Sequence, residues 1–95
     1  MKYKLSQYGK DNLKRARLSL SALTIDSEIK AGRRKTRGDY MMELCELEDA
    51  FAEGWIRDER ISSTDFQVML SQLTVYCRSY RDRIKKAFAE SQPNG

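Results

Sequence analysis

Residues 62–88 read SSTDFQVMLSQLTVYCRSYRDRIKKAF and form the longest unbroken helical pattern in the chain. The apolar side chains recur at steps of three and four, which places them on one stripe of an α-helix. They are Phe66, Met69, Leu70, Leu73, Tyr76, Cys77, Tyr80, Ile84, Ala87 and Phe88. This spacing predicts one long amphipathic helix onto which the rest of the chain packs.

The start of this helix carries its own signals. Ser62 is a favoured N-cap residue, and Asp65 follows three positions later, as in a capping box. Ile61 can pack against Phe66 across the cap. We expect the helix to run to about residue 90 and to end in a frayed tail at 91–95.

A second helix is expected at residues 40–53. Asp39 is its predicted N-cap, and Gly54 its predicted terminator, because glycine is favoured just past a helix end. Trp55 then lies beyond the glycine, where an apolar residue often folds back onto the last helical turn.

The short connector near Asp58 makes the second and third helices antiparallel neighbours. Counting outward from it places Tyr40 opposite Tyr76. In the same register Cys77 lies roughly 9 Å along the helix from the position opposite Cys45, beyond the reach of an unstrained disulfide. We therefore expect free thiols. Both cysteines lie on apolar stripes, which predicts buried, reduced side chains in a reducing compartment.

The first helix is expected at residues 12–31, between an N-cap at Asp11 and a stop at Gly32, after a loose arm at 1–9. Its apolar residues fall on two nearly opposite faces, since each residue advances about 100°. Three explanations are open: a helix sandwiched in the core, a break near residues 24–26, or a face for a partner or a second copy. One face holds Leu13, Ala16, Leu20 and Leu23, and the other holds Leu18, Ala22, Ile25 and Ile29.

These patterns predict an all-α protein with a single helical domain at 1–95, in which the first helix packs across a hairpin of the other two. A chain of 95 residues buries about 60 to 65 % of its unfolded surface, so the core is small. No apolar run approaches the roughly 20 residues that span a bilayer, and the first residues are charged. We expect a soluble cytoplasmic protein that does not bind membranes.

The chain contains no histidine, the commonest general base near neutral pH and the commonest neutral metal ligand. Ser-His, Cys-His and zinc-protease motifs are thereby excluded, and no glycine-rich phosphate or dinucleotide motif is present. Two distant cysteines do not form a zinc site. We expect no catalytic residues, no metal and no cofactor, hence no enzyme and no small-molecule substrate.

Charge is segregated along the chain. Residues 1–37 hold 11 Lys and Arg against 3 acids, residues 38–65 hold 2 against 9, and residues 66–95 hold 5 against 2. Four cations lie in the loop between Gly32 and Gly38, and more precede it. These cations predict a binding site for phosphate groups or for an acidic protein surface, because arginine binds both phosphate and carboxylate groups bidentately. The predicted site comprises Arg33, Arg34, Lys35, Arg37, Lys14, Arg15 and Arg17.

A structural interpretation of this charge is also open. The basic first helix can lie beside the acidic second helix and pair with Glu43, Glu46, Asp49 and Glu53. Exposed pairs contribute only about 0 to 1 kcal/mol each, so pairing alone is a weak reason to keep so many arginines.

A further set of residues predicts a protein interface: Leu18, Ile25, Ile29 and Trp55. For Trp55 a local helix-end contact competes with a role as an interface anchor, a role in which tryptophan is enriched. Two functions follow. The leading one is a non-enzymatic regulatory or inhibitory binding protein that engages nucleic acid or a nucleoprotein complex through its basic N-terminal half and arginine loop. The alternative is a protein-only adaptor or inhibitor, or a homodimer, that acts through the second apolar face and the acidic helix.

Overall fold

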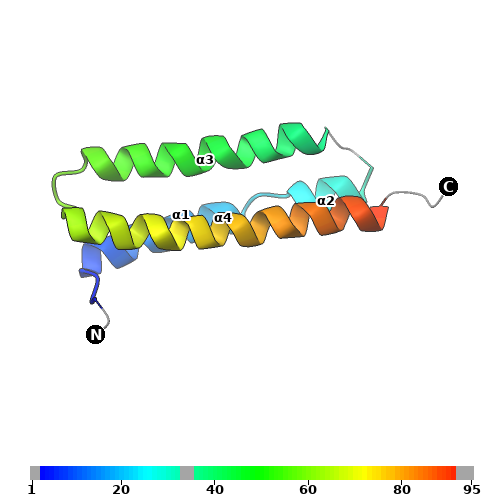
Figure 1. Ribbon diagram of the computed structural model, residues 1–95. Helices are drawn as coiled ribbons and strands as arrows, with labels where there is room; N and C mark the ends of the chain where they lie inside the picture. Colours follow the sequence, from blue (N-terminus) through cyan, green and yellow to red (C-terminus); the bar gives the residue numbers. More distant parts are fainter. Residues whose placement is uncertain (1–2, 33–35, 92–95) are drawn as a thin grey trace.

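The computed structural model describes residues 3–32 and 36–91. Over these ranges the chain forms four α-helices and no strand: α1 (Gln7–Ser21), α2 (Ile25–Lys30), α3 (Arg37–Arg57) and α4 (Ser63–Ser91) (Figure 1). The all-α fold expected from the sequence is confirmed. None of these helices combines the length and the apolar character that crossing a lipid bilayer requires.

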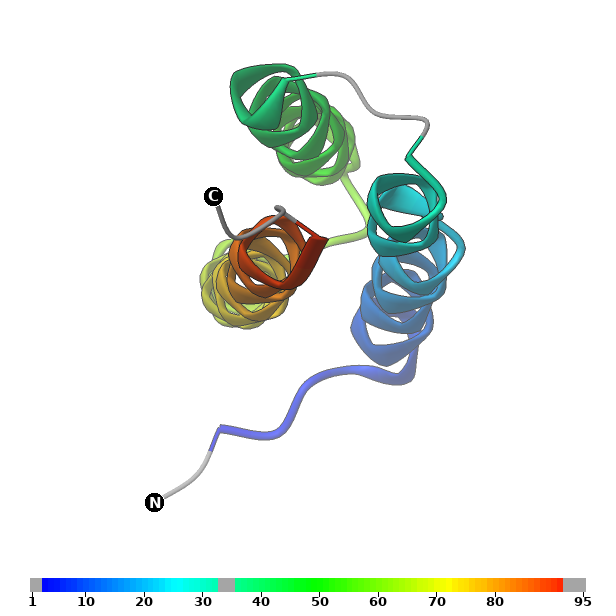
Figure 2. The same cartoon turned by 90° about the vertical axis from the view of Figure 1, so that its right-hand side faces the viewer.

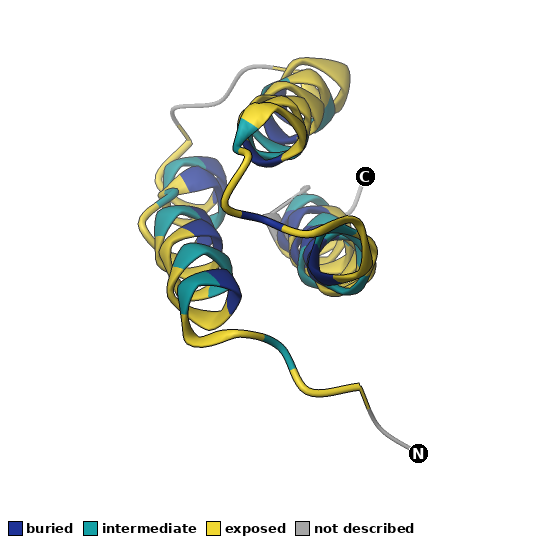
Figure 3. Cartoon of the chain, turned by 90° about the vertical axis from the view of Figure 1, so that its left-hand side faces the viewer, coloured by how far each residue is buried: buried dark blue, intermediate teal, exposed yellow. Residues whose placement is uncertain are grey.

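Helix α4 packs against α1, α2 and α3 and so organises the fold, as predicted. The Ser62 hydroxyl caps it by accepting a hydrogen bond from the Asp65 amide at 3.1 Å. Seen end-on, α3, α4 and the α1–α2 pair form the three corners of a bundle (Figure 2), and their buried parts face one another (Figure 3). The buried apolar residues of α4 follow the predicted spacing: Met69, Leu73, Cys77, Tyr80, Ile84 and Ala87.

The predicted first helix is interrupted between α1 and α2. A break in this helix was one of the three explanations for its two apolar faces. Helix α1 ends at Ser21, and α2 begins at Ile25 after the N-cap residue Thr24. The Tyr80 hydroxyl of α4 donates a hydrogen bond of 2.9 Å to the Leu23 carbonyl in the break. This bond gives a hydrogen-bond partner to a backbone carbonyl that lies outside both helices.

The break changes the helical phase of the chain. Ala16 and Leu20 of α1 and Ile25 and Ile29 of α2 would lie on nearly opposite faces of a continuous helix, yet all four belong to the same buried core. Helix α2 ends before Gly32, which has a φ of +80°, the left-handed conformation that glycine adopts most readily. The predicted stop at Gly32 is therefore confirmed.

The predicted loose arm at 1–9 is corrected, because α1 takes in its last three residues. Ser6 is the N-cap of α1: its hydroxyl accepts a hydrogen bond from the Gly9 amide at 3.0 Å and donates one to the Asp65 carboxylate at 2.6 Å. The Tyr3 hydroxyl donates to the other oxygen of Asp65, also at 2.6 Å. Two hydrogen bonds make the near-complete burial of this carboxylate tolerable.

Asp11, the predicted N-cap, lies inside α1 and accepts a hydrogen bond from the Gln7 side chain. Gly9 is also inside the helix and is buried. A Cβ atom at Gly9 would lie 3.2 Å from an oxygen of Asp65, so this glycine permits a close approach of α1 to α4.

A second contact ties α1 to the connector between α3 and α4. The Tyr8 hydroxyl donates a hydrogen bond to the Asp58 carboxylate. The Arg60 guanidinium forms an ion pair with Asp58 at 3.1 Å and lies 4.6 Å from the centre of the Tyr8 ring. We call the residues that attach the N-terminal segment the N-terminal clasp: Tyr3, Ser6, Tyr8, Asp58 and Asp65.

Helix α3 is longer at both ends than the predicted 40–53. Thr36 and Asp39 form a reciprocal capping box, so the N-cap is Thr36, three residues before the predicted N-cap. Gly54 does not end the helix, because a single glycine costs only about 0.5–1 kcal/mol and the next turn is held by packing. Trp55 is a helical residue, 5 % exposed, with its ring 5.8 Å from that of Phe51.

The predicted register of α3 against α4 is also corrected. Tyr40, expected opposite Tyr76, packs its ring 6.0 Å from that of Phe88. Because α3 continues to Arg57, the middle of the connector lies later in the chain than expected. The side chains of α3 also lean toward its N-terminus, away from the connector, which moves each contact further along α4.

Candidate nucleic-acid interface

Three cations of α1 lie on one stripe beside α4. Lys10, Lys14 and Arg17 are spaced by four and three residues, so their side chains share a helical face, and all three are exposed. They line a hollow of about 170 Å³ between the two helices, together with Leu13 and Tyr76. None of these lining residues is acidic.

A second hollow of about 150 Å³ continues the same seam between α1 and α4. Arg17 and Tyr76 line both hollows, so the two are adjacent. Arg83 and Ser79 of α4 and Ser21 of α1 supply further polar lining. The cationic stripe of α1 therefore meets a cation from α4.

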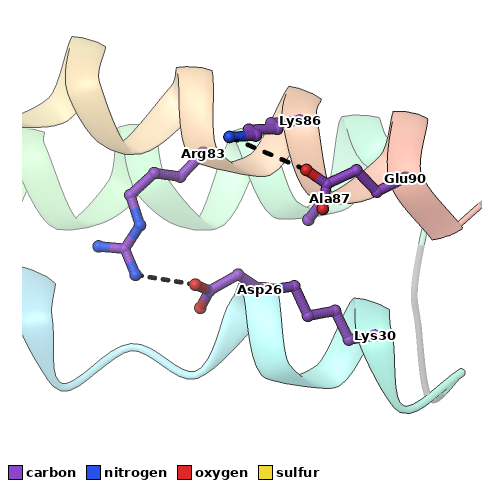
Figure 4. A pocket seen from close by; sticks show the side chains of 6 residues that line it. All are labelled: Asp26, Lys30, Arg83, Lys86, Ala87 and Glu90. Carbon is purple, nitrogen blue, oxygen red and sulfur yellow. Dashed lines mark hydrogen bonds and ion pairs between the residues drawn. The ribbon is translucent and has the colours of Figure 1, made fainter.

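A third hollow, of about 260 Å³, lies between α2 and α4 and is again lined by Arg83. Figure 4 shows Arg83 reaching across from α4 to Asp26 of α2, with a nitrogen-to-oxygen distance of 2.8 Å. Lys86 pairs with Glu90 on α4 at 3.9 Å, and Lys30 lines the hollow from α2. This part of the seam contains both signs of charge.

The three hollows form one line because α1 and α2 run parallel to α4. The contacts from Ser6 to Asp65 and from Asp26 to Arg83 join residues 59 and 57 positions apart, a nearly constant offset. We call the cations along this line the basic seam: Lys10, Lys14, Arg17, Lys30, Arg83 and Lys86.

The basic seam has an α1 half, with Lys10, Lys14 and Arg17, and an α2 half, with Lys30, Arg83 and Lys86. The two halves differ electrostatically. In the α2 half, the hydrogen bond from Arg83 lowers the pKa of Asp26, and the Arg83 guanidinium also lies 4.8 Å from the centre of the Tyr80 ring. In the α1 half, Lys10, Lys14 and Arg17 form no ion pair with any described residue. The positive charge of the α1 half is therefore not neutralised within the described part of the chain.

The structure distributes the predicted binding residues over several places. Lys14 and Arg17 belong to the basic seam, whereas Arg15 is exposed on α1 but is not among the lining residues. Arg37 is exposed at the first position of α3. The remaining cations of the predicted arginine loop lie outside the described residues: Arg33, Arg34 and Lys35.

The predicted protein interface is corrected by burial. Ile25, Ile29 and Trp55 are 2 %, 1 % and 5 % exposed and belong to the hydrophobic core. Only Leu18, at 55 % exposure, remains on the surface. The physical reason is the break, which turns the apolar side of α2 toward α4, and the continuation of α3 through Trp55.

The acidic helix does not neutralise α1. Within the described part of the chain, Glu48 of α3 forms an ion pair with Arg81 of α4 at 3.1 Å, and no cation of α1 pairs with α3. Glu46, Asp49 and Glu53 of α3 are exposed. Pairing between the first and second predicted helices therefore does not account for the basic character of α1.

The two cysteines have different environments, which corrects the expectation that both are buried. Cys45 is exposed and Cys77 is buried, and both are free thiols. Burial raises the pKa of the Cys77 thiol to about 11, whereas the Arg81 guanidinium lies 4.0 Å from the sulfur of Cys45. The described residues contain no group of three side chains arranged to hold a metal ion.

Several seam residues were not among the binding residues predicted from the sequence. Tyr76, Ser79, Arg83 and Lys86 flank the core stripe of α4 at steps of three and four, which is a helical signal. The spacing can be seen in the sequence. However, these residues of α4 lie beside α1 and Lys30 only because the helices run parallel, and local sequence patterns do not determine this direction.

Comparison with protein-family models, with curated proteins and with solved structures finds no match to this chain. The residues of the basic seam are therefore the basis on which a function can be proposed.

Proposed function

We propose that this protein is a non-enzymatic regulatory or inhibitory binding protein whose basic seam engages the phosphate backbone of nucleic acid, free or within a nucleoprotein complex. The observation that carries the proposal is the α1 half of the seam. There, three exposed cations surround a hollow without acidic lining and form no ion pair with a described residue. Like charges on one helical stripe repel each other, and a bound polyanion relieves this repulsion.

The length of the seam favours a polyanion over a single acidic group. Lys10 and Lys30 are 20 residues apart along two helices that follow α4, which corresponds to roughly 30 Å at 1.5 Å per residue. A nucleic-acid strand offers a phosphate at every nucleotide over such a length, whereas an acidic protein surface has to match each cation separately.

The alternative function, a protein-only adaptor or homodimer, has less support. It relied on a second apolar face of the first helix, and that face loses Ile25 and Ile29 to the core. Leu18 remains exposed, but one aliphatic side chain is an ordinary surface feature. No observation favours this function over nucleic-acid binding by the basic seam.

The proposal is tested by measuring binding of labelled oligonucleotides by fluorescence anisotropy over a range of salt concentrations. The test variant replaces Lys10, Lys14 and Arg17 with glutamine. Each phosphate contact releases counterions and makes the plot of log K against log salt steeper. We therefore expect the slope to be shallower by about 2 to 3 units in this variant.

A matched control removes the same net charge elsewhere. Arg57, Arg78 and Lys85 are exposed and are not among the residues that line the seam. Replacing them with glutamine should leave most of the salt slope intact. Equal losses in the two triple variants would mean that net charge alone drives binding, and an affinity that is flat with salt would exclude phosphate contacts.

A further inference from the structure

We propose that the ligand of the basic seam is single-stranded nucleic acid and that Tyr76 is the aromatic platform on which one of its bases stacks. This inference rests on the proposed function, because it names the substrate class of the same site. It adds a role for Tyr76, because binding of phosphates by the cations alone would not need an aromatic ring at this position.

The first argument is the hydrogen bonding of the tyrosines. Four of the five tyrosines donate a hydrogen bond from the hydroxyl group: Tyr3 to Asp65, Tyr8 to Asp58, Tyr40 to Glu28 and Tyr80 to the Leu23 carbonyl. Tyr76 is the exception among the described residues, since its hydroxyl donates to none of them. Its ring also has no aromatic or cation–π partner in the described part of the chain. The contacts that hold the other tyrosine side chains are therefore absent at Tyr76 within the described part of the chain, which leaves its ring available to a ligand.

The second argument is the position of Tyr76 in the seam. Its half-buried ring packs partly against the core and lines both the first and the second hollow. Lys14 and Arg17 lie on its α1 side, and Arg83 lines the second hollow with it. An aromatic ring between cations is the arrangement by which proteins hold a strand, with phosphates on the cations and a base on the ring.

The third argument is shape. Two packed helices lie about 8–10 Å apart, so the seam between them is a shallow concave line rather than a projecting element. Duplex DNA is commonly read by a helix or ribbon that enters a major groove about 12 Å wide. The described seam offers no such projection, whereas a single strand can lie along a concave line with its bases turned toward the protein.

A structural role for Tyr76 is the competing explanation, because the ring touches the core. Two variants separate the explanations. Tyr76→Phe keeps the ring and removes the hydroxyl, which donates to no described residue. Tyr76→Leu keeps an apolar side chain against the core but removes the aromatic face.

The experiment compares four labelled ligands by fluorescence anisotropy at one salt concentration: a 12-nucleotide oligo-dT, a 12-nucleotide oligo-U, and DNA and RNA duplexes of the same length. We expect the wild-type protein to bind the single strands at least tenfold more tightly than either duplex. The dT and U arms differ in the 2′-hydroxyl and in the thymine methyl group, and together they report whether the protein binds the DNA or the RNA strand more tightly.

Tyr76→Leu should weaken single-strand binding by about 5- to 150-fold, the range observed for removing one base–aromatic stack, and Tyr76→Phe should stay within about twofold of the wild type. Circular dichroism checks that both variants remain helical. If Tyr76→Leu lost its fold, the strand preference of the wild-type protein would still decide the first half of the inference.

The outcomes distinguish the inference from the function on which it rests. Equal or tighter binding of the duplexes, with a steep salt slope, would overturn the single-strand inference and leave the phosphate-binding function in place. Wild-type affinity in a folded Tyr76→Leu variant would overturn the role of the ring. No binding of any oligonucleotide at low salt would overturn both proposals and would turn attention to an acidic protein partner.

Discussion

Replacing Ile29 with alanine should destabilise the protein strongly, whereas the same truncation at Leu18 should change its stability little. The two residues are 11 positions apart, which corresponds to only about 20° around a continuous helix at 100° per residue. Without a break they would share one environment. With the break between α1 and α2, Ile29 is 1 % exposed and Leu18 is 55 % exposed.

The size of the effect follows from this burial. Truncation of a fully buried isoleucine to alanine costs about 2–5 kcal/mol, and the cost is lower where the surroundings can relax. Helix α2 has 6 residues and adjoins a break, so we expect about 2–3.5 kcal/mol for Ile29→Ala. This is a large part of the roughly 5–14 kcal/mol by which a domain of this size is stable. Leu18→Ala should stay within about 0.5 kcal/mol.

Urea unfolding measures both variants. Circular dichroism follows the helices, and the fluorescence of Trp55, the single tryptophan, follows the core near the connector. With a slope of about 1.5 kcal/mol per molar urea, the midpoint should fall by about 1.3–2.3 M for Ile29→Ala and by less than about 0.4 M for Leu18→Ala. Equal shifts for the two variants would refute the argument that the break turns α2 onto α4.

Two further predictions concern titratable groups. The Tyr8 hydroxyl, together with Arg60, lowers the pKa of Asp58 from 3.8 to about 2, so the ionised group contributes stability that is present above about pH 4 and is lost as the pH falls toward 2. The urea midpoints of the wild type and Asp58→Asn should therefore differ most at pH 7 and converge as the pH falls from about 4 toward 2, and a difference at pH 2 as large as the one at pH 7 would contradict the clasp. A thiol reagent at neutral pH should label Cys45 alone in the native chain and both cysteines in urea, because Cys77 is buried and has a pKa of about 11. Mass spectrometry counts the labels, and rapid double labelling of the native chain would contradict the burial of Cys77.

The parts of the fold that the sequence predicted are those determined by local periodicity. The stripe of α4 and its Ser62 cap were predicted because both depend on residues a few positions apart. The start of α1 was not, because Ser6 has its second partner, Asp65, 59 positions away. The end of α3 was not, because the packing of Trp55 outweighs the weak helix-ending tendency of Gly54.

The candidate site was predictable in composition but not in arrangement. Charge segregation identified Lys14 and Arg17, which line the seam. Tyr76 was placed in the helical hairpin because its spacing fits a core stripe, and its ring does touch the core. Arg83 could not be joined to α1 from the pattern alone, because this juxtaposition depends on the break and on the parallel direction of α1 and α4.

The break therefore connects the core to the proposed interface. It turns Ile25 and Ile29 into the core, and the same rotation brings Asp26 within 2.8 Å of Arg83 and places Lys30 along the seam. Because Asp26 holds Arg83, the α2 half of the seam has less charge available for a phosphate than the α1 half. A bound strand should therefore depend most on the α1 cations, and relieving the pair by Asp26→Asn should strengthen binding while weakening the attachment of α2 to α4.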